Sequence, residues 1–380
     1  MNMPMNMPTR IRFLVNDATD IQPSQTTAML IAAAVARGHS VGLVGVGDLS
    51  CGPEGQPWAQ VRVLEPGTTL QRLAQPLAPP KRQPLADTDL LLMRTNPARD
   101  LARAAAHSFA LSLAHRCQDQ GVRVLNDPSG LLRAATKLYL LELPEFTRPR
   151  SLVSQNRAEI LDFIQGLDTA AVLKPLQGTR GHDVFWVSSA QDKNLNQIID
   201  VILRQGLVMA QRCIPGAEAG DTRVVVLNGE VLEINGHPAA IQRVPGSGDF
   251  RSNLHAGGHA KPGVVTEEMR RAIAAIGPKL VKDGLFLAGL DSSAVSWWRL
   301  MCLVLAGCEM PKSLAAKTLQ AESSSALPRA NSSQERLAWA AWATASMSSC
   351  ASFAKASWAG AEVLKFPSDW AVRARICQSS

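Results

Sequence analysis

The chain lacks most of the features that mark secreted, membrane-spanning or metal-cluster proteins. Its seven cysteines are scattered, with no C-x-x-C pair and no metal-ligand spacing. The opening residues MNMPMNMPTR contain no long apolar run, so we expect no signal peptide. The apolar stretch Trp297 to Ala306 is too short to cross a bilayer. These absences predict a cytoplasmic protein with reduced thiols and no membrane partner.

A basic surface for nucleic acid is also missing. The net charge is +7, but residues 1–291 are nearly balanced, with 30 Lys and Arg against 27 Asp and Glu. The arginines of this part do not form a patch with interleaved aromatic residues, which excludes nucleic acid as an expected partner. A chain of 380 residues that is 46% hydrophobic is long enough for two or three globular domains.

The first third of the chain predicts an α/β domain with a parallel sheet. Short apolar runs alternate with helical patterns, and the first helix ends at Gly38, a residue type typical of helix C-termini. The proline-rich segment 76–84 predicts a loop. The predicted strands cover residues 11–15, 41–44, 90–93 and 122–125, and the predicted helices cover residues 26–37 and 102–118.

From Ser129 onward the pattern predicts an α+β region. Asn228-Gly229 lies between two strand-like runs and predicts a hairpin turn. The predicted helices are residues 131–140, 157–165 and 267–282, and the predicted strands are residues 148–153, 170–173, 208–211, 221–227, 230–234 and 285–290.

One of these strands leads into the most informative motif, Lys174-Pro175-Leu176 followed by Gln177-Gly178-Thr179-Arg180-Gly181. A lysine at the end of a buried strand can meet a nucleotide phosphate as a point charge. The two glycines let backbone N–H groups approach phosphate oxygens. The motif therefore predicts a phosphate site, although a surface lysine before a glycine turn would give the same residues.

Several segments in a fixed order resemble the ATP-grasp superfamily, and within it the bacterial glutathione synthetase family, over residues 10–291. The matching segments are ADTDLLLMRTNP, VLNDPSGLLRAATKL, VLKPLQGTRG, DTRVVVLNGE, RVPGSGDFRSNLHAGG and GLFLAGLD. The resemblance implies an N-terminal α/β domain at residues 1–128 followed by an ATP-grasp module. In that module residues 129–215 would be the lid subdomain and residues 216–291 an incomplete C-terminal subdomain.

The resemblance also implies a reaction and its ligands. ATP would phosphorylate the C-terminal carboxylate of γ-glutamylcysteine, and the amine of glycine would attack the acyl phosphate to give glutathione. Lys137, Lys174, Gly178, Gly181 and Gln211 match the nucleotide positions of the family. The expected cofactors are ATP and Mg²⁺, and the expected partners are small molecules, with a homo-oligomer left open.

The acid substrate would meet arginines. The acid-binding positions of the family are matched by Arg94, Arg223, Arg243, Arg251 and Asn253, and of these Arg223 and Arg243 are the expected catalytic residues. Guanidinium groups bind carboxylates and phosphates bidentately, which suits a substrate with two carboxylates. The glycine-rich segment 245–258 resembles the family's closing loop, which would exclude water from the intermediate.

The resemblance fails directly after Asp291, which matches the first magnesium ligand. The family places a Glu-x-Asn strand about ten residues later, but no Glu follows until Glu309 and no Asn until Asn331. Glu233-Ile234-Asn235 matches the Glu-x-Asn pattern but lies upstream of Asp291, so we interpret the match as coincidental. Magnesium would bind oxygen ligands of this kind.

Residues 292–380 differ in composition from the rest of the chain. They hold six of the eight tryptophans and four of the seven cysteines, and Ser and Ala make up 36 of their 89 residues. The segment Ser296 to Leu303 can be encoded as AGC TGG TGG AGG TTA ATG TGT TTA. Read from one nucleotide earlier, that sequence gives Leu-Val-Glu-Val-Asn-Val-Phe, which restores Glu-x-Asn. We therefore predict a one-nucleotide loss near the codons for Asp291 and Ser292; a divergent C-terminal domain is the alternative.

Two other functions stay open from the sequence. One is an ATP-grasp ligase that joins a different acid and amine. The other is a nucleotide-binding pseudoenzyme: the chain lacks two of the expected metal ligands and the final core strand, so we expect it to be inactive or misfolded as it stands.

Overall fold

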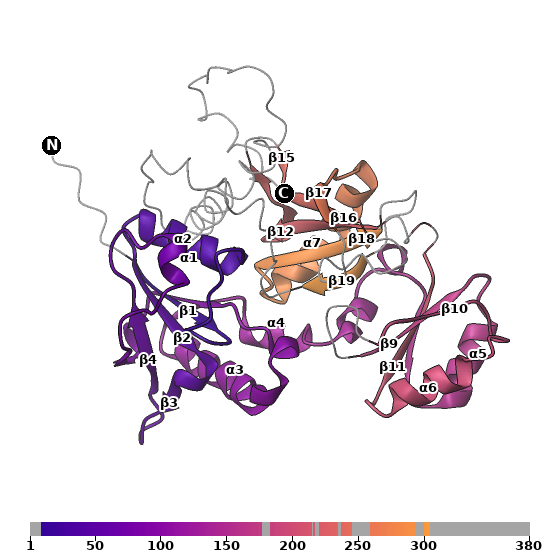
Figure 1. Ribbon diagram of the computed structural model, residues 1–380, viewed down its shortest axis with the longest axis horizontal. Coiled ribbons are helices and arrows are strands. Elements are labelled where there is room, and N and C mark those ends of the chain that lie inside the picture. The colour runs from indigo at the N-terminus through magenta and orange to yellow at the C-terminus, as the bar shows by residue number, and fades with distance from the viewer. Residues whose placement is uncertain are drawn as a thin grey trace, which may run out of the picture.

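The computed structural model describes residues 9–176, 183–214, 216, 220–234, 237–244, 259–293 and 300–304. Within this part the strands form three main sheets and one two-stranded sheet, β14 (Glu233–Ile234) with β15 (His237–Pro238). Figure 1 shows the three sheets following one another along the chain, each with its own helices. None of the described helices is long and apolar enough to span a membrane.

The first sheet has the strand order β3-β4-β2-β1-β6-β7, with β5 paired to β4. Its central strands β2, β1, β6 and β7 run parallel. Their bounds are β1 Arg10–Val15, β2 Ser40–Gly45, β6 Leu90–Met93 and β7 Arg123–Leu125. The helix α1 (Thr26–Ala36) packs in one core cluster and α3 (Ala104–Asp119) in another, so the two helices cover opposite faces.

The α/β prediction is confirmed here, but one local prediction is wrong. The proline-rich segment expected as a loop contains a strand, β5 (Lys81–Pro84), which pairs with β4 (Pro57–Val63). Proline is tolerated because β5 lies at the sheet's edge, where a missing N–H donor breaks no ladder. The remaining short elements are β3 Leu49–Cys51, α2 Leu70–Leu73, and the 3₁₀ helices Val46–Asp48, Leu85–Asp87, Pro97–Arg99 and Leu101–Arg103.

The second sheet is antiparallel and has helices on one face. Its order is β10-β9-β11-β8, and α5 and α6 pack on it through a shared apolar cluster. The helix α5 has the predicted bounds, and its start is fixed by Asn156, whose side chain accepts a hydrogen bond from Ala158 N. The bounds are β8 Ser151–Ser154, α5 Arg157–Gln165, β9 Ala171–Pro175, β10 Phe185–Val187, α6 Leu195–Leu203 and β11 Val208–Arg212.

The third sheet has the order β17-β16-β12-β18-β19, with β13 paired to β12. The predicted turn joins β12 to β13, and Asn228 and Gly229 have φ values of 49° and 83°, as a tight hairpin turn requires. Its bounds are β12 Asp221–Leu227, β13 Glu230–Val231, β16 Ala240–Val244, β17 His259–Pro262, β18 Leu287–Ser293 and β19 Leu300–Val304.

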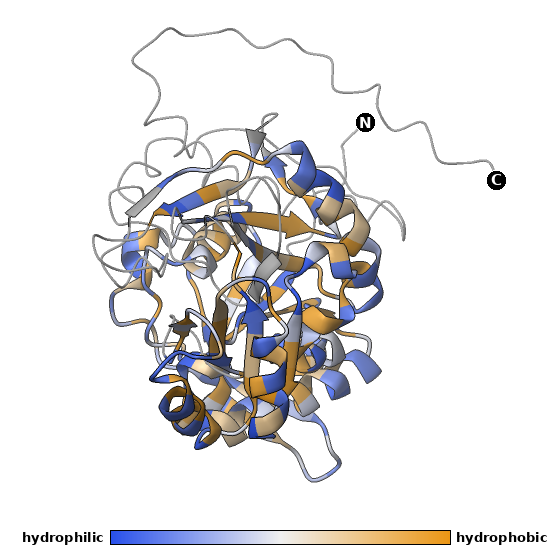
Figure 2. Ribbon diagram, turned by 90° about the vertical axis from the view of Figure 1, so that its right-hand side faces the viewer, coloured by the Kyte–Doolittle hydropathy of each residue, from blue (hydrophilic) through white to orange (hydrophobic). Residues whose placement is uncertain are grey.

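The helix α7 (Glu267–Lys282) packs against this third sheet. Thr266 accepts a hydrogen bond from Met269 N, and acidic residues in the first turn and lysines in the last turn complement the helix dipole. Figure 2 shows apolar residues concentrated on the strands and polar residues on the outward turns of the helices. The three cores are therefore built by amphipathic helices on sheets.

The segment between the first two sheets differs from the single helix predicted over residues 131–140. It forms α4 (Pro128–Arg133) and, after a break, a 3₁₀ helix, Lys137–Glu142; a second 3₁₀ helix covers Glu145–Thr147. Thr136 ends the break by accepting a hydrogen bond from Leu138 N. Tyr139 and Leu140 are buried with α7, so this segment packs against the third sheet.

Candidate functional site

Two residues that the sequence predicts to bind a nucleotide lie on neighbouring strands of the second sheet. Lys174 is in β9 and Gln211 in β11, and both are largely buried, with exposed fractions of 8% and 4%. Gln211 Nε2 donates a hydrogen bond to Ser151 Oγ at 2.9 Å. The register pairs Lys174 with Met209 and Gln211 with Val172, which places the lysine and the amide two residues apart along the same sheet face.

Lys137, the other predicted nucleotide lysine, reaches the end of the same strand. Its Nζ donates to the carbonyl oxygens of Pro175 at 2.9 Å and Leu176 at 3.3 Å. Its backbone N–H also donates to Leu176 O. The structure therefore brings both lysines to the point where β9 leads into the glycine motif.

The predicted acyl-phosphate and metal residues meet on the third sheet in what we call the strand cluster, Asp221, Arg223, Arg243 and Asp291. The register places Asp221 opposite Arg243, and Arg223 opposite Asp291. Arg223 Nε and Nη2 each lie 2.6 Å from an oxygen of Asp291. Arg243 donates to both oxygens of Asp221 at 2.6 and 2.7 Å, and its Nη2 lies 2.9 Å from Asp291 Oδ2.

Burial sets the electrostatics of the strand cluster. Asp221 and Asp291 are each 5% exposed. Loss of solvent, followed by the neighbouring Asp291 charge, raises the pKa of Asp221 to about 6. Loss of solvent also favours protonation of Asp291, but Arg223 and Arg243 outweigh it and hold the pKa of Asp291 below its ordinary value. The cluster therefore holds a firmly ionised Asp291 beside a more readily protonated Asp221.

The described residues do not fit a resident magnesium ion at Asp291. Both of its oxygens accept charge-assisted hydrogen bonds from guanidinium groups. Within the described ranges, no group of three His, Cys, Asp or Glu side chains is placed to hold a metal. Glu233, from the upstream Glu-x-Asn spelling, lies in the small β14–β15 sheet and pairs with Arg270 at 2.7 Å.

The remaining described candidate, Arg94, lies at the carboxyl end of β6 in the first sheet. It is 8% exposed, and its guanidinium donates to Thr27 Oγ1 at 3.3 Å and Thr26 Oγ1 at 3.4 Å, at the start of α1. Its backbone N–H donates to Leu14 O of the adjacent β1. Ligands of open α/β sheets bind at such carboxyl edges.

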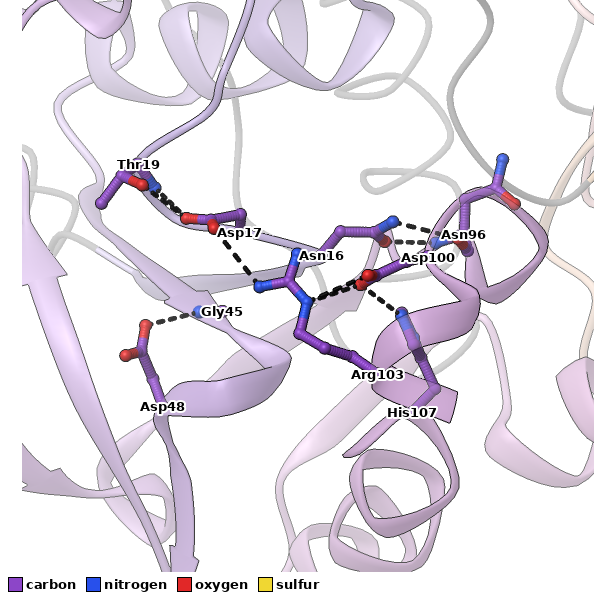
Figure 3. A network of polar contacts seen from close by, with 9 residues as sticks. All are labelled: Asn16, Asp17, Thr19, Gly45, Asp48, Asn96, Asp100, Arg103 and His107. Atoms are coloured by element: carbon purple, nitrogen blue, oxygen red, sulfur yellow. Dashed lines mark hydrogen bonds and ion pairs between the residues drawn. The ribbon is translucent and has the colours of Figure 1, made fainter. Parts of the chain in front are cut away.

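Sequence reasoning missed a second group at this edge, which we call the loop network: Asp17, Asp100, Arg103 and His107. Arg103 Nε lies 2.9 Å from Asp100 Oδ2, and Arg103 Nη1 lies 3.3 Å from Asp17 Oδ2. His107 Nε2 contacts Asp100 Oδ2 at 2.8 Å. Figure 3 shows this network between Asp17, in the loop that follows β1, and the residues that lead into α3.

A second link joins the same two loops. Asn96 N donates to Asn16 Oδ1 at 2.6 Å, and Asn16 Nδ2 donates to Asn96 O at 3.0 Å. In Figure 3 this pair lies beside the loop network. The segment that follows Arg94 is therefore fastened to the segment that follows β1. Polar residues stand directly after two parallel strands, and this pattern could have predicted these contacts from the sequence.

Asp221 was also missed, although it stands two residues before Arg223 in the DTR segment, where alternate residues share a face. Four predicted residues, Gly178, Gly181, Arg251 and Asn253, lie outside the described residues, as does the expected closing loop. The site roles assigned to all these residues stay predictions.

Comparison with known proteins connects these observations. Residues 9–132 match the model of the prokaryotic glutathione synthetase N-terminal domain, and residues 136–294 match that of its ATP-grasp domain. The second match ends three residues after Asp291, where the sequence resemblance failed. Residues 292–380 therefore lie almost wholly outside both matches.

Curated relatives cover the same part of the chain. The glutathione synthetase of Synechococcus elongatus is 34% identical over 293 residues, which span 74% of this chain and 86% of the relative. That of Gloeobacter violaceus is 36% identical over 288 residues, 74% of this chain and 85% of the relative.

Solved structures agree on the fold. D-cycloserine synthetase DcsG has a TM-score of 0.53 at 16% identity and covers 87% of this chain and 98% of its own. A RiPP-associated ATP-grasp ligase of Chryseobacterium gregarium has a TM-score of 0.54 at 13% identity and covers 90% and 97%. With both domains matched in order and the ATP-grasp fold present, the chain belongs to the prokaryotic glutathione synthetase family.

Proposed function

We propose that this protein is an ATP-dependent ligase that joins γ-glutamylcysteine to glycine and forms glutathione through an acyl phosphate. Family membership over both domains supports the reaction class, and the similar relatives carry the name glutathione synthetase. In the first step a carboxylate oxygen of the dipeptide attacks the γ-phosphorus of ATP, and ADP leaves. In the second step the glycine nitrogen attacks the acyl carbon, phosphate leaves, and the nitrogen loses a proton.

The observation that carries the proposal is the strand cluster. Two guanidinium groups on adjacent strands converge on one buried carboxylate, with distances of 2.6 to 2.9 Å. An acyl phosphate presents the same kind of oxygen acceptors as Asp291 and carries more charge. Arg223 and Arg243 can therefore exchange their carboxylate partners for the reacting group and stabilise charge that develops during transfer.

ATP is the nucleotide that the ATP-grasp fold binds, and we assign its contacts to the second sheet. Lys174 and Lys137 lie at the end of β9, where their ammonium groups can neutralise phosphate oxygens. Gln211 would present backbone and side-chain groups to the base. Magnesium would supply positive charge to the phosphates, but the described residues build no site for it.

Arg94 would bind a carboxylate of the dipeptide distant from the reacting one. The dipeptide has two carboxylates, and only one is consumed. The buried guanidinium of Arg94, bonded to two threonine hydroxyls, suits the spectator carboxylate. No side-chain nucleophile is required, because alignment and charge stabilisation carry this reaction class.

The test is ADP release by the full chain with γ-glutamylcysteine and glycine, alone and together, beside a panel of other acids and amines. The proposal expects release above background only with the complete pair, and glutathione among the products. Arg223→Met should reduce the turnover rate by roughly a hundredfold or more. Faster release with another acid–amine pair would contradict the substrate assignment and favour a different ATP-grasp ligase.

A second function, nucleotide binding without ligation, is favoured by one observation. Asp291 is occupied by two arginines, and no Glu-x-Asn follows it in the sequence. Calorimetry that shows ATP binding, together with an assay that shows no turnover, would support this function over the ligase.

A further inference from the structure

Trp186 is a tryptophan on the edge strand β10 whose side chain is 49% exposed. The other tryptophan in the described part of the chain, Trp58, is half-buried, with the Arg82 guanidinium 4.0 Å from its ring centroid. Exposing an indole ring to water is unfavourable. Single exposed apolar residues are nevertheless common on protein surfaces, so exposure alone does not indicate a function. The position of Trp186 in the sheet is what gives it meaning.

The strand register places Trp186 in one row with a predicted nucleotide residue. Trp186 lies opposite Val172, Val172 opposite Gln211, and Gln211 opposite Ser151. Residues directly opposite each other in antiparallel strands point to the same face. Lys174 follows Val172 by two residues and shares that face as well.

The other face of the same sheet is filled. Leu173, Val187 and Ala210 alternate with the residues of the row and are buried against Ile164 of α5 and Ile199 of α6. In Figure 1 these helices lie on the outer side of β9 and β11, away from β18 and β19. Trp186 therefore lies on the face that carries Lys174 and Gln211, which no described helix of this sheet covers.

The row combines a buried amide, an apolar residue and an exposed indole. Gln211 is 4% exposed and its amide is committed to Ser151, while Val172 between the two strands is half-buried. The Cα atoms of Trp186 and Gln211 are separated by two strand spacings, roughly 9 to 10 Å. Val172 can thus form an apolar floor, with Trp186 as a wall on one side.

We propose that Trp186 stacks against the adenine ring of bound ATP and is a base-recognition residue of this protein. The inference rests on the proposed function, which puts ATP on this face. An indole offers an apolar π surface that fits a purine but carries no positive charge to attract phosphate. Trp186 and Lys174 therefore recognise different halves of the same ligand, because the lysine ammonium binds oxygen anions.

The separate contributions of Trp186 and Lys174 can be measured as the affinities of the full chain for two probes, ATP and inorganic tripolyphosphate. Calorimetry gives both affinities at the same magnesium concentration. Trp186→Ala should weaken ATP binding about tenfold, within the range that aromatic stacking gives, and leave tripolyphosphate binding unchanged. Trp186→Phe should keep ATP affinity within about threefold, because a smaller ring still stacks. Lys174→Ala should weaken the binding of both probes.

Trp58→Phe is the matched control, because it also removes an indole but lies in the first sheet; it should bind both probes as the wild type does. Far-UV circular dichroism checks that each variant is folded. ATP affinity of Trp186→Ala within twofold of wild type, or equal weakening of both probes, overturns the inference. If the wild type binds neither probe, it is the proposed function that fails.

Discussion

The strand cluster and the loop network each contain two aspartates that pair with arginine. They differ in how deeply the charged side chains are buried and in which elements fix their positions. The strand cluster is buried and lies on three adjacent strands, so the sheet register fixes its geometry. The loop network joins two loops, and the side chains of Arg103 and Asp17 are each 39% exposed. A ligand at the strand cluster must displace an existing ion pair, whereas the loop network acts on its surroundings by holding two loops together.

Removing one arginine from each group should separate the buried ion pairs from the part-exposed ones. Arg243→Met leaves Asp221 and Asp291 buried with a single arginine, and should lower the free energy of unfolding by about 4 kcal/mol. Arg103→Met removes a part-exposed, solvent-screened partner and should lower it by about 1 kcal/mol or less. Urea unfolding followed by circular dichroism measures both, and equal losses would contradict the distinction.

One carboxylate of each group, Asp221 and Asp100, should change stability with pH in opposite directions. The pKa of Asp221 is raised from 3.8 to about 6, so its stabilisation is complete below pH 4 and is lost as pH rises through 6. The pKa of Asp100 is lowered: burial opposes this, but Arg103 and His107 outweigh it. Its stabilisation is therefore present above pH 4 and is lost as pH falls.

Replacing each aspartate by asparagine isolates its own contribution to the pH dependence of stability. The unfolding free energy of the wild type minus that of Asp221→Asn should decrease by roughly 2 to 3 kcal/mol between pH 4 and pH 7. The corresponding difference for Asp100→Asn should increase as pH rises from 3 to 5. Urea titrations at half-unit pH steps give both curves, and slopes of the same sign would show that the two carboxylates do not differ as described.

A smaller effect is expected at His107. Its side chain is 5% exposed, and its Nδ1 has no hydrogen-bond partner among the described residues. His107→Asn keeps a donor for Asp100 and should lower the free energy of unfolding by about 1 kcal/mol, less than His107→Ala, which also leaves a cavity. Equal stability of the two variants would indicate that the contact with Asp100 contributes nothing.

Local signals predicted much of the fold. The helices α5 and α7 have the bounds predicted from the sequence, and in the structure Asn156 and Thr266 cap their first turns. The strands β4 and β5 were not found, because their pairing is a tertiary contact and a proline-rich edge looks like a loop. The helix predicted over residues 131–140 is broken because Lys137 bonds to the carbonyls that end β9, a partner that no local pattern reveals.

The sequence likewise predicted some residues of the candidate site but not their mutual contacts. Residue types and family order pointed to Arg223, Arg243 and Asp291, but their mutual contacts follow from the register of β16, β12 and β18. Asp221 was missed because its role depends on lying opposite Arg243. The loop network was missed because Asp17 and Asp100 are separated by more than 80 residues and meet only through Arg103.

We infer that the family's Glu-x-Asn metal ligands, absent after Asp291, were lost with the reading frame, as the sequence predicts, and that restoring the frame restores activity. Glutathione formation from ATP, γ-glutamylcysteine and glycine should be measured for this chain and for the product of the gene with one nucleotide restored between the codons for Asp291 and Ser292. We expect roughly thousandfold faster turnover in the restored protein, since a metal ligand set supplies several kcal/mol of charge stabilisation. Equal or faster turnover by the chain as it stands would contradict it.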